Sequence, residues 1–195
     1  MRPQATLWLL DLAACDDAAL ARGLESLGAS VQQRFRRFRR EERQRQFLAG
    51  RLLLRRALAD ASGADGTQIQ FFERPGLPPL ASMPGAQPYF SISHAGRWVA
   101  CVVSMSAPLG LDVELQSRQR DFSALAEHSF DAATAQRIAA LPPTQRALPF
   151  YREWCRLEAA YKLGQPAQYW QYPAHAQLAI AVASSVEFEL HLRAA

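Results

Sequence analysis

Residues 108–118 have the sequence PLGLDVELQSR, and apolar and acidic residues alternate at its centre. Alternate residues of a β-strand share one face, so Leu111 and Val113 point one way. Asp112 and Glu114 then point together to the other side. A strand with one solvated face has this pattern. Two carboxylates on one face also suit Mg²⁺, which proteins hold with one or two carboxylates and phosphate oxygens. The strand alone leaves both interpretations open.

The composition is that of a soluble globular protein. The chain has 195 residues, of which 49% are hydrophobic and 21% charged. This size suits one domain, or two small halves that share a core. Because no apolar run approaches the roughly 20 residues needed to span a bilayer, we expect no membrane segment. Asp11 interrupts the apolar N-terminal stretch, which favours a first strand over Ala5–Leu12 instead of a signal peptide.

Three cysteines bear on the compartment. Cys15, Cys101 and Cys155 are far apart and odd in number, and their spacing fits neither a zinc site nor a disulfide framework. A reducing compartment is therefore expected, and the sequence predicts a cytoplasmic protein.

The basic residues are almost all arginine. The net charge is +4, and Lys162 is the single lysine beside 21 arginines. Ten of the arginines lie within residues 34–56. This segment could be a solvated helix face, a nucleic-acid patch or a site for a phosphorylated ligand, and the composition does not choose among them.

Helical and strand patterns alternate without a regular βαβ order, which favours an α+β fold over a doubly wound sheet. Helices are predicted over 16–35 with Asp16 or Asp17 as cap, from about Glu41 to Gly63, over 121–130 and 131–141, and from after Pro149 to a stop at Gly164. Strands are predicted over 5–12, at the start of 68–80, as a pair over 88–105 that turns at 95–97, over 108–116, and as a pair over 176–194, with a polar loop over 117–121.

The last predicted helix carries a stripe of three residues. Trp154, Glu158 and Lys162 are four residues apart, so they lie on one helix face. An aromatic anchor followed by a surface ion pair would give the same spacing. However, the stripe contains the only lysine of the chain.

A second candidate site lies at the end of the strand that ends in FSISHAGRW, residues 90–98. Ser93 and His94, with nearby amides, would suit a phosphate, and strand-end loops collect binding groups. A histidine in such a place can also be a structural turn residue.

Five segments occur in this order along the chain: the arginine-rich helix, the loop ERPGLPPL at 73–80, the Ser93–His94 turn, the strand with Asp112 and Glu114, and the helix with Trp154, Glu158 and Lys162. Together they resemble a 4'-phosphopantetheinyl transferase of the long, single-chain type that activates surfactin synthetase. The resemblance covers roughly residues 34–165. It implies a pseudo-dimer of two similar α+β halves, 1–108 and 109–195, with the active site in the cleft between them. It also implies transfer of the phosphopantetheine arm of coenzyme A to a serine of an apo acyl, peptidyl or aryl carrier protein, with release of 3',5'-ADP. Mg²⁺ is the implied cofactor, and a monomer that binds neither nucleic acid nor membrane is expected.

The resemblance also assigns roles to residues. The implied metal ligands are Asp112, Glu114 and Glu158; the catalytic set is Glu158, Lys162 and Asp112; the coenzyme A contacts are Ser93, His94, Arg74 and Arg45. Glu158 would take the proton of the carrier serine. Lys162 would neutralise the departing 3',5'-ADP.

The chain departs from the family pattern in three places. Leu157 stands where the family often has lysine, and Thr134 stands where many members have a third acid, with Asp131 nearby. The part after Gly164 is short for this type. These departures keep open a non-catalytic descendant that binds coenzyme A or a carrier protein. A nucleic-acid binder that uses residues 34–56 is the third hypothesis, and it leaves Asp112 and Glu114 unexplained.

Overall fold

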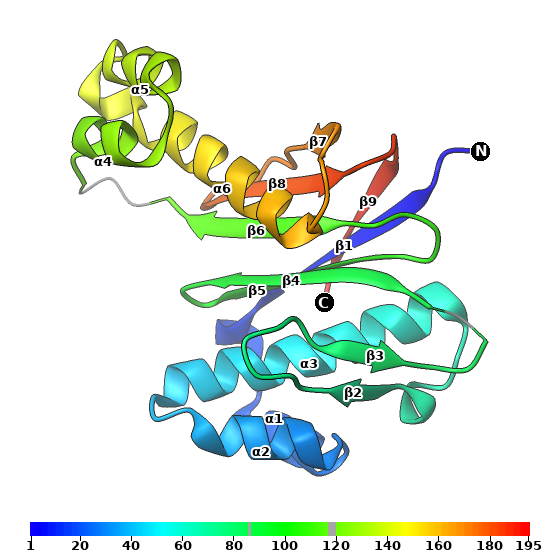
Figure 1. The fold of residues 1–195 in the computed structure, drawn as a ribbon. Coiled ribbons are helices and arrows are strands. Elements are labelled where there is room, and N and C mark those ends of the chain that lie inside the picture. The colour runs from blue at the N-terminus through cyan, green and yellow to red at the C-terminus, as the bar shows by residue number, and fades with distance from the viewer. Residues whose placement is uncertain (86, 117–119) are drawn as a thin grey trace.

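The structure, a computed structural model, describes residues 1–85, 87–116 and 120–195. Residues 117–119 of the predicted loop lie outside this part. Along the chain, each half has a strand, two short helices, one long helix and then a closing set of strands (Figure 1). The first half contains β1 (Gln4–Asp11), α1 (Asp17–Glu25), α2 (Ala29–Arg37), α3 (Glu41–Ser62), β2 (Gln70–Phe72), β3 (Leu80–Ser82), β4 (Tyr89–Ala95) and β5 (Trp98–Ser104). The second half contains β6 (Gly110–Leu115), α4 (Phe122–Ser129), α5 (Ala132–Ala139), α6 (Ala147–Leu163), β7 (Tyr169–Gln171), β8 (Leu178–Ser184) and β9 (Glu189–Ala194).

The strand order repeats between the halves. The first sheet has the order β4-β5-β1-β9 and the second β6-β8-β7. In both halves the first strand pairs antiparallel with the last strand of the hairpin, so β4-β5-β1 corresponds to β7-β8-β6. The final strand β9 then crosses over and pairs parallel with β1. The fold is thus an α+β pseudo-dimer, which confirms the predicted fold class.

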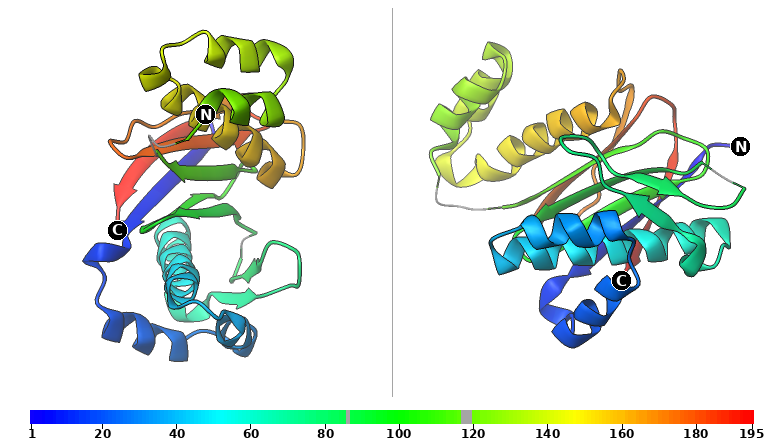
Figure 2. Two further views of the ribbon diagram at one scale, coloured as in Figure 1. Left: turned by 90° about the vertical axis from the view of Figure 1, so that its left-hand side faces the viewer. Right: turned by 60° about the horizontal axis from the view of Figure 1, so that its bottom comes forward.

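One long helix covers the outer face of each sheet, α3 on the first and α6 on the second (Figure 2). The inner faces pack against each other: Leu7 of β1, Val102 of β5 and Val113 of β6 belong to one buried cluster with Val182 of β8. Burial of such side chains contributes about 1.5–3 kcal/mol each. This shared core fixes the position of the second half on the first.

The junction between the halves runs along β4 and β6. Phe90 and Ile92 of β4 point toward the core around α3. The alternate residues Ser91 and Ser93 are buried on the opposite face, where their hydroxyl oxygens accept hydrogen bonds from β6 backbone amides, at 3.0 Å from Leu111 N and 3.3 Å from Val113 N. Serine hydroxyls therefore link β4 to β6 where two paired strands would form backbone–backbone hydrogen bonds.

The helical region predicted over 16–35 contains two helices, α1 and α2, separated at buried Leu27 and exposed Gly28. Asp16, one of the two predicted caps, is the N-cap of α1. The predicted start of the last long helix, after Pro149, was wrong. The helix α6 begins at Ala147 and includes Pro149, because a proline in the first turn loses no intrahelical hydrogen bond. Its end at Gly164, with φ 72°, agrees with the prediction.

No helix in the described ranges is long and apolar enough to span a bilayer.

Candidate active site

The acidic face of β6 is largely buried. It is therefore not a solvated strand face, which was one of the two interpretations that the alternating sequence left open. Leu111 and Val113 face the core between the sheets, as the alternation predicts. Asp112 is only 5% exposed because α6 covers its side of the strand. A buried carboxylate must be paired to remain charged.

Asp112 is held by one residue from each half. Lys162 Nζ lies 2.7 Å from Asp112 Oδ1, and Ser93 Oγ donates to the same oxygen at 2.9 Å. The ammonium also donates to Ser93 Oγ at 3.1 Å. These contacts join β4, β6 and α6 in one charged cluster. Three of the predicted site residues, distant in sequence, therefore meet at the junction of the halves.

The second oxygen of Asp112 has no partner. No described N–H or O–H group donates to Oδ2, although the atom is buried; the nearby Cys155 thiol, whose pKa burial and the Asp112 carboxylate raise, is only a weak donor. Nearly all buried polar atoms in proteins are hydrogen-bonded, so this exception calls for an explanation, such as a bound ion or water. A divalent cation would satisfy this oxygen.

Glu114 lies further along the same face of β6, in a pocket of about 200 Å³ that Arg120 and Trp154 also line. Burial raises the pKa of the Glu114 carboxyl, and the neighbouring Asp112 carboxylate raises it further. Lys162, Arg120 and a hydrogen bond from Trp154 act in the opposite direction. A cation beside Asp112 would therefore also stabilise the ionised form of Glu114.

Glu158 lies on α6 between Trp154 and Lys162, as the helical stripe predicts. It is partly buried, and within the described ranges its carboxylate makes neither a hydrogen bond nor an ion pair. In the same part of the chain, no group of three or more His, Cys, Asp or Glu residues is arranged to hold a metal. The arrangement fits Mg²⁺ bound by one or two carboxylates plus substrate oxygens better than a complete protein cage.

His94 follows Ser93 at the end of β4 and is mostly buried. The pKa of its imidazole is lowered to about 4, chiefly by burial, then by the charge of Arg43 and to a smaller extent by that of Lys162. Arg43 Nη1 lies 2.7 Å from Nε2 and 3.1 Å from Nδ1 of the ring. A guanidinium can only donate, so the ring is neutral at physiological pH.

This pKa predicts a pH-dependent stability. The unfolded histidine titrates near 6.5 and the folded one near 4, so between these values the unfolded chain binds more protons. The free energy of unfolding should consequently fall as the pH decreases through this window, by roughly 2–3 kcal/mol from His94. Urea unfolding at pH 7.5 and 4 should show the loss in the wild type and a smaller one in His94→Gln. Equal losses in both proteins would contradict the assignment.

Arg74 lies in a different pocket, of about 340 Å³, between α2 and the loop after β2. Its guanidinium donates to the carbonyl of Pro78 through Nε at 3.1 Å and Nη2 at 2.8 Å. Arg34 and Arg37 line the same pocket, above the buried carboxylate of Glu73. This pocket is the most arginine-rich of those described.

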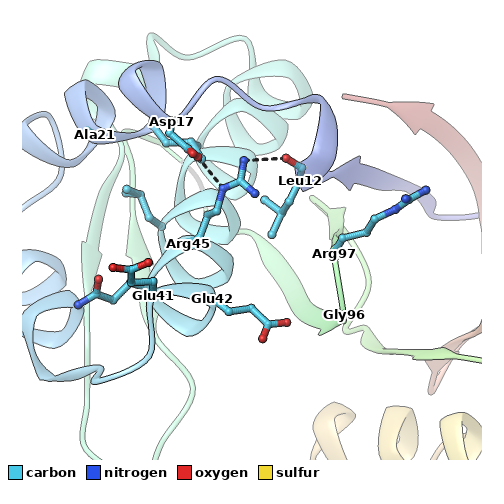
Figure 3. A pocket seen from close by; sticks show the side chains of 11 residues that line it. Leu12, Asp17, Ala21, Glu41, Glu42, Arg45, Gly96 and Arg97 are labelled. Atoms are coloured by element: carbon cyan, nitrogen blue, oxygen red, sulfur yellow. Dashed lines mark hydrogen bonds and ion pairs between the residues drawn. The ribbon is translucent and has the colours of Figure 1, made fainter.

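Arg45 does not join the Asp112 cluster. Figure 3 shows it in a pocket of about 470 Å³ between α1 and α3. Its Nε donates to Asp17 at 2.6 Å, and its Nη2 donates to the carbonyls of Leu12 and Cys15 at 2.9 and 3.1 Å. These contacts tie the end of β1 and the start of α1 to α3, which gives Arg45 a structural role.

The departures from the family pattern have structural counterparts. Asp131 caps α5 by accepting from the Thr134 amide at 2.9 Å, so its carboxylate serves the helix terminus. Leu157 is 41% exposed on α6, beside Glu158. All three cysteines are unpaired thiols.

Comparison with known proteins agrees with this arrangement. Residues 16–106 match the family model of the 4'-phosphopantetheinyl transferase N-terminal domain, and residues 108–193 match that of the 4'-phosphopantetheinyl transferase superfamily. The chain belongs to the 4'-phosphopantetheinyl transferase superfamily.

Several curated members of the superfamily are similar to the chain. A 4'-phosphopantetheinyl transferase of Bacillus subtilis is 31% identical over 145 residues, which is 72% of this chain and 61% of the relative. HetI of a Nostoc species is 30% identical over 66% of this chain and 55% of its own length. Sfp of Bacillus subtilis is 27% identical over 72% of this chain and 61% of its own length, in agreement with the long, single-chain type. The chain thus spans 55–65% of the length of the first curated relatives it matches.

Proposed function

We propose that this superfamily member transfers the phosphopantetheine arm of coenzyme A to a serine of an apo carrier protein and releases 3',5'-ADP. The observation that carries the proposal is the buried Asp112 cluster at the junction of the halves, with one carboxylate oxygen left without a donor. In this proposal the halves 1–108 and 109–195 supply opposite walls of one active site.

Mg²⁺ fits this site because Asp112 Oδ2 lacks a donor and Glu114 lies on the same face of β6. Asp112 and Glu114 would hold it, together with the coenzyme A pyrophosphate, and Glu158, the third predicted ligand, would act at the ion or through one water, since the described residues form no three-acid metal group. When bound, the ion would supply positive charge that counters the charge developing on the leaving group.

The protein side chains have separate roles in the proposed reaction. Glu158, which has no described partner of its own, accepts the proton of the carrier serine at its carboxylate oxygen. Lys162 donates from Nζ to an oxygen of the departing 3',5'-ADP. Ser93 orients Asp112 and Lys162 through its hydroxyl, and His94 binds phosphate as a neutral donor.

The nucleotide end of coenzyme A is proposed to lie toward Arg74. The pocket beside it offers Arg34 and Arg37 for phosphate and the ring of Phe38 for stacking. Arg45 was also predicted to contact the 3'-phosphate, but its donors are used by Asp17 and two carbonyls. Arg45 is therefore the weakest of the predicted contacts.

The test is intact-mass spectrometry of an apo carrier protein incubated with this protein, coenzyme A and Mg²⁺. The carrier should gain the mass of one phosphopantetheine, and EDTA should abolish the gain. Acyl, peptidyl and aryl carriers belong in the same experiment, because nothing in the site distinguishes them. A carrier that gains the same mass without this protein would invalidate the assay.

A non-catalytic binder is the second candidate. The absence of a three-acid metal group in the described ranges and the exposed Leu157 favour it. It predicts coenzyme A binding without a mass gain on any carrier. That result would replace the transferase proposal.

A further inference from the structure

Arg43 is one of the arginines of the basic segment that have no acidic partner among the described residues. Arg45 pairs with Asp17, and Arg34 and Arg51 pair with Glu73. For Arg43, no carboxylate within the described ranges comes close enough for an ion pair, and the side chain is exposed. It therefore presents an uncompensated charge at the start of α3.

The side chain is nevertheless held in place. Gln46, one turn later and only 4% exposed, donates from Nε2 to the Gly96 carbonyl at 2.7 Å. That bond fixes the orientation of its amide, whose Oε1 then accepts from Arg43 Nη1 at 2.9 Å. A charge held before binding loses less conformational entropy when a ligand arrives.

The location connects Arg43 to the Asp112 cluster. Its Nη1 contacts the His94 imidazole, and that ring is close enough to Lys162 and Asp112 for both charges to act on its pKa. Arg43 therefore adds a positive charge at the His94 end of the site, beside that of Lys162. Its Nε and Nη2 have no hydrogen-bond acceptor among the described residues. A planar guanidinium with free donors suits a phosphate group.

We propose that Arg43 is a substrate-binding residue that donates hydrogen bonds to a phosphate group of coenzyme A, held in place by Gln46 and His94. This inference rests on the proposed function and adds a residue to its binding site.

The test is isothermal titration of coenzyme A into the wild type, Arg43→Gln, Arg43→Lys and the control Arg22→Gln. Arg22 is an exposed arginine on α1, so its substitution makes the same change in net charge elsewhere. Arg43→Gln should weaken binding about 10- to 100-fold, the usual effect of losing a charged hydrogen bond. Arg43→Lys should weaken coenzyme A binding less than Arg43→Gln does, because lysine keeps the positive charge although it lacks the planar set of N–H donors of arginine. Arg43→Gln can lower the melting temperature by a few degrees, because buried Gln46 Oε1 loses its donor, so binding is compared at a temperature where all variants are folded.

The outcomes separate this inference from the proposed function. If the wild type binds coenzyme A and Arg43→Gln binds it as tightly as Arg22→Gln, the inference alone fails. If the wild type does not bind coenzyme A at all, both fail. A repeat with 3'-dephospho-coenzyme A identifies the contact: the effect of Arg43→Gln disappears if Arg43 meets the 3'-phosphate and persists if it meets the pyrophosphate.

Discussion

Asp112→Asn is expected to lower kcat/KM for phosphopantetheine transfer by at least about 10³-fold while the protein stays folded. The amide has the shape of the carboxylate, so its oxygen can still accept from Ser93 and Lys162. It loses the charge that offsets the Lys162 ammonium, and its NH₂ group replaces the oxygen that has no donor. If a bound cation supplies several kcal/mol of charge stabilisation, removing its main ligand costs three or more powers of ten in rate.

The measurement is the rate of carrier modification by mass spectrometry, at several Mg²⁺ concentrations. Asp60→Asn is the matched control, because Asp60 is an aspartate on α3 whose partner is Arg193 of β9, outside the proposed site. The control should transfer at the wild-type rate, and circular dichroism should show both variants folded. Near wild-type transfer by Asp112→Asn would remove the proposed metal role.

The sequence predicted the acidic strand and the helical stripe because each depends on local periodicity. The two-residue spacing placed Asp112 and Glu114 on one face, and the four-residue spacing placed Glu158 and Lys162 on one side of α6. Neither spacing predicts how far apart the strand and the helix lie in the folded protein. That Lys162 meets Asp112, 50 residues earlier, follows from the packing of α6 on β6; the resemblance assigned both residues to one active site but did not predict this contact.

The arginines show where local patterns fail. Ten of them lie within residues 34–56: three on α2, two between the helices, and five on α3, which presents them in different directions. Arg45 and Arg43 lie two positions apart, about 200° around a helix with 3.6 residues per turn. One consequently turns to Asp17 and the other to His94. Only the position of β4 beside α3 distinguishes them, and residue type carries no such information.

A strand buried on both faces can have the same sequence pattern as a strand with one exposed face. The polar face of β6 has the alternation of a solvated strand, and it is buried because α6 crosses it. The three-residue β7 was missed, since so short a segment carries too little pattern to identify.

Gly110→Ala is expected to damage both stability and transfer. Gly110 begins β6, and a Cβ placed there would lie 1.9 Å from the Ala159 carbonyl oxygen and 2.7 Å from Leu163 N. Both are backbone atoms of α6, so no side-chain rotation relieves the clash. Since the helix must move, the free energy of unfolding should fall by about 3 kcal/mol, the upper part of the range for overpacked sites. Glu158 directly precedes Ala159, and Lys162 directly precedes Leu163, so both would move with the helix.

The control for Gly110→Ala is Gly66→Ala, where an added Cβ meets nothing closer than 3.8 Å. The control should unfold and transfer as the wild type does, within about 0.5 kcal/mol in stability. A displacement of the order of 1 Å at catalytic groups costs about 10²-fold in rate, so Gly110→Ala should lose that much transfer even at temperatures where it is fully folded. If it loses stability but keeps the full rate, α6 does not carry the groups that act on the substrate. If it loses neither, α6 and β6 are further apart than described, and this result would also contradict the Asp112–Lys162 contact.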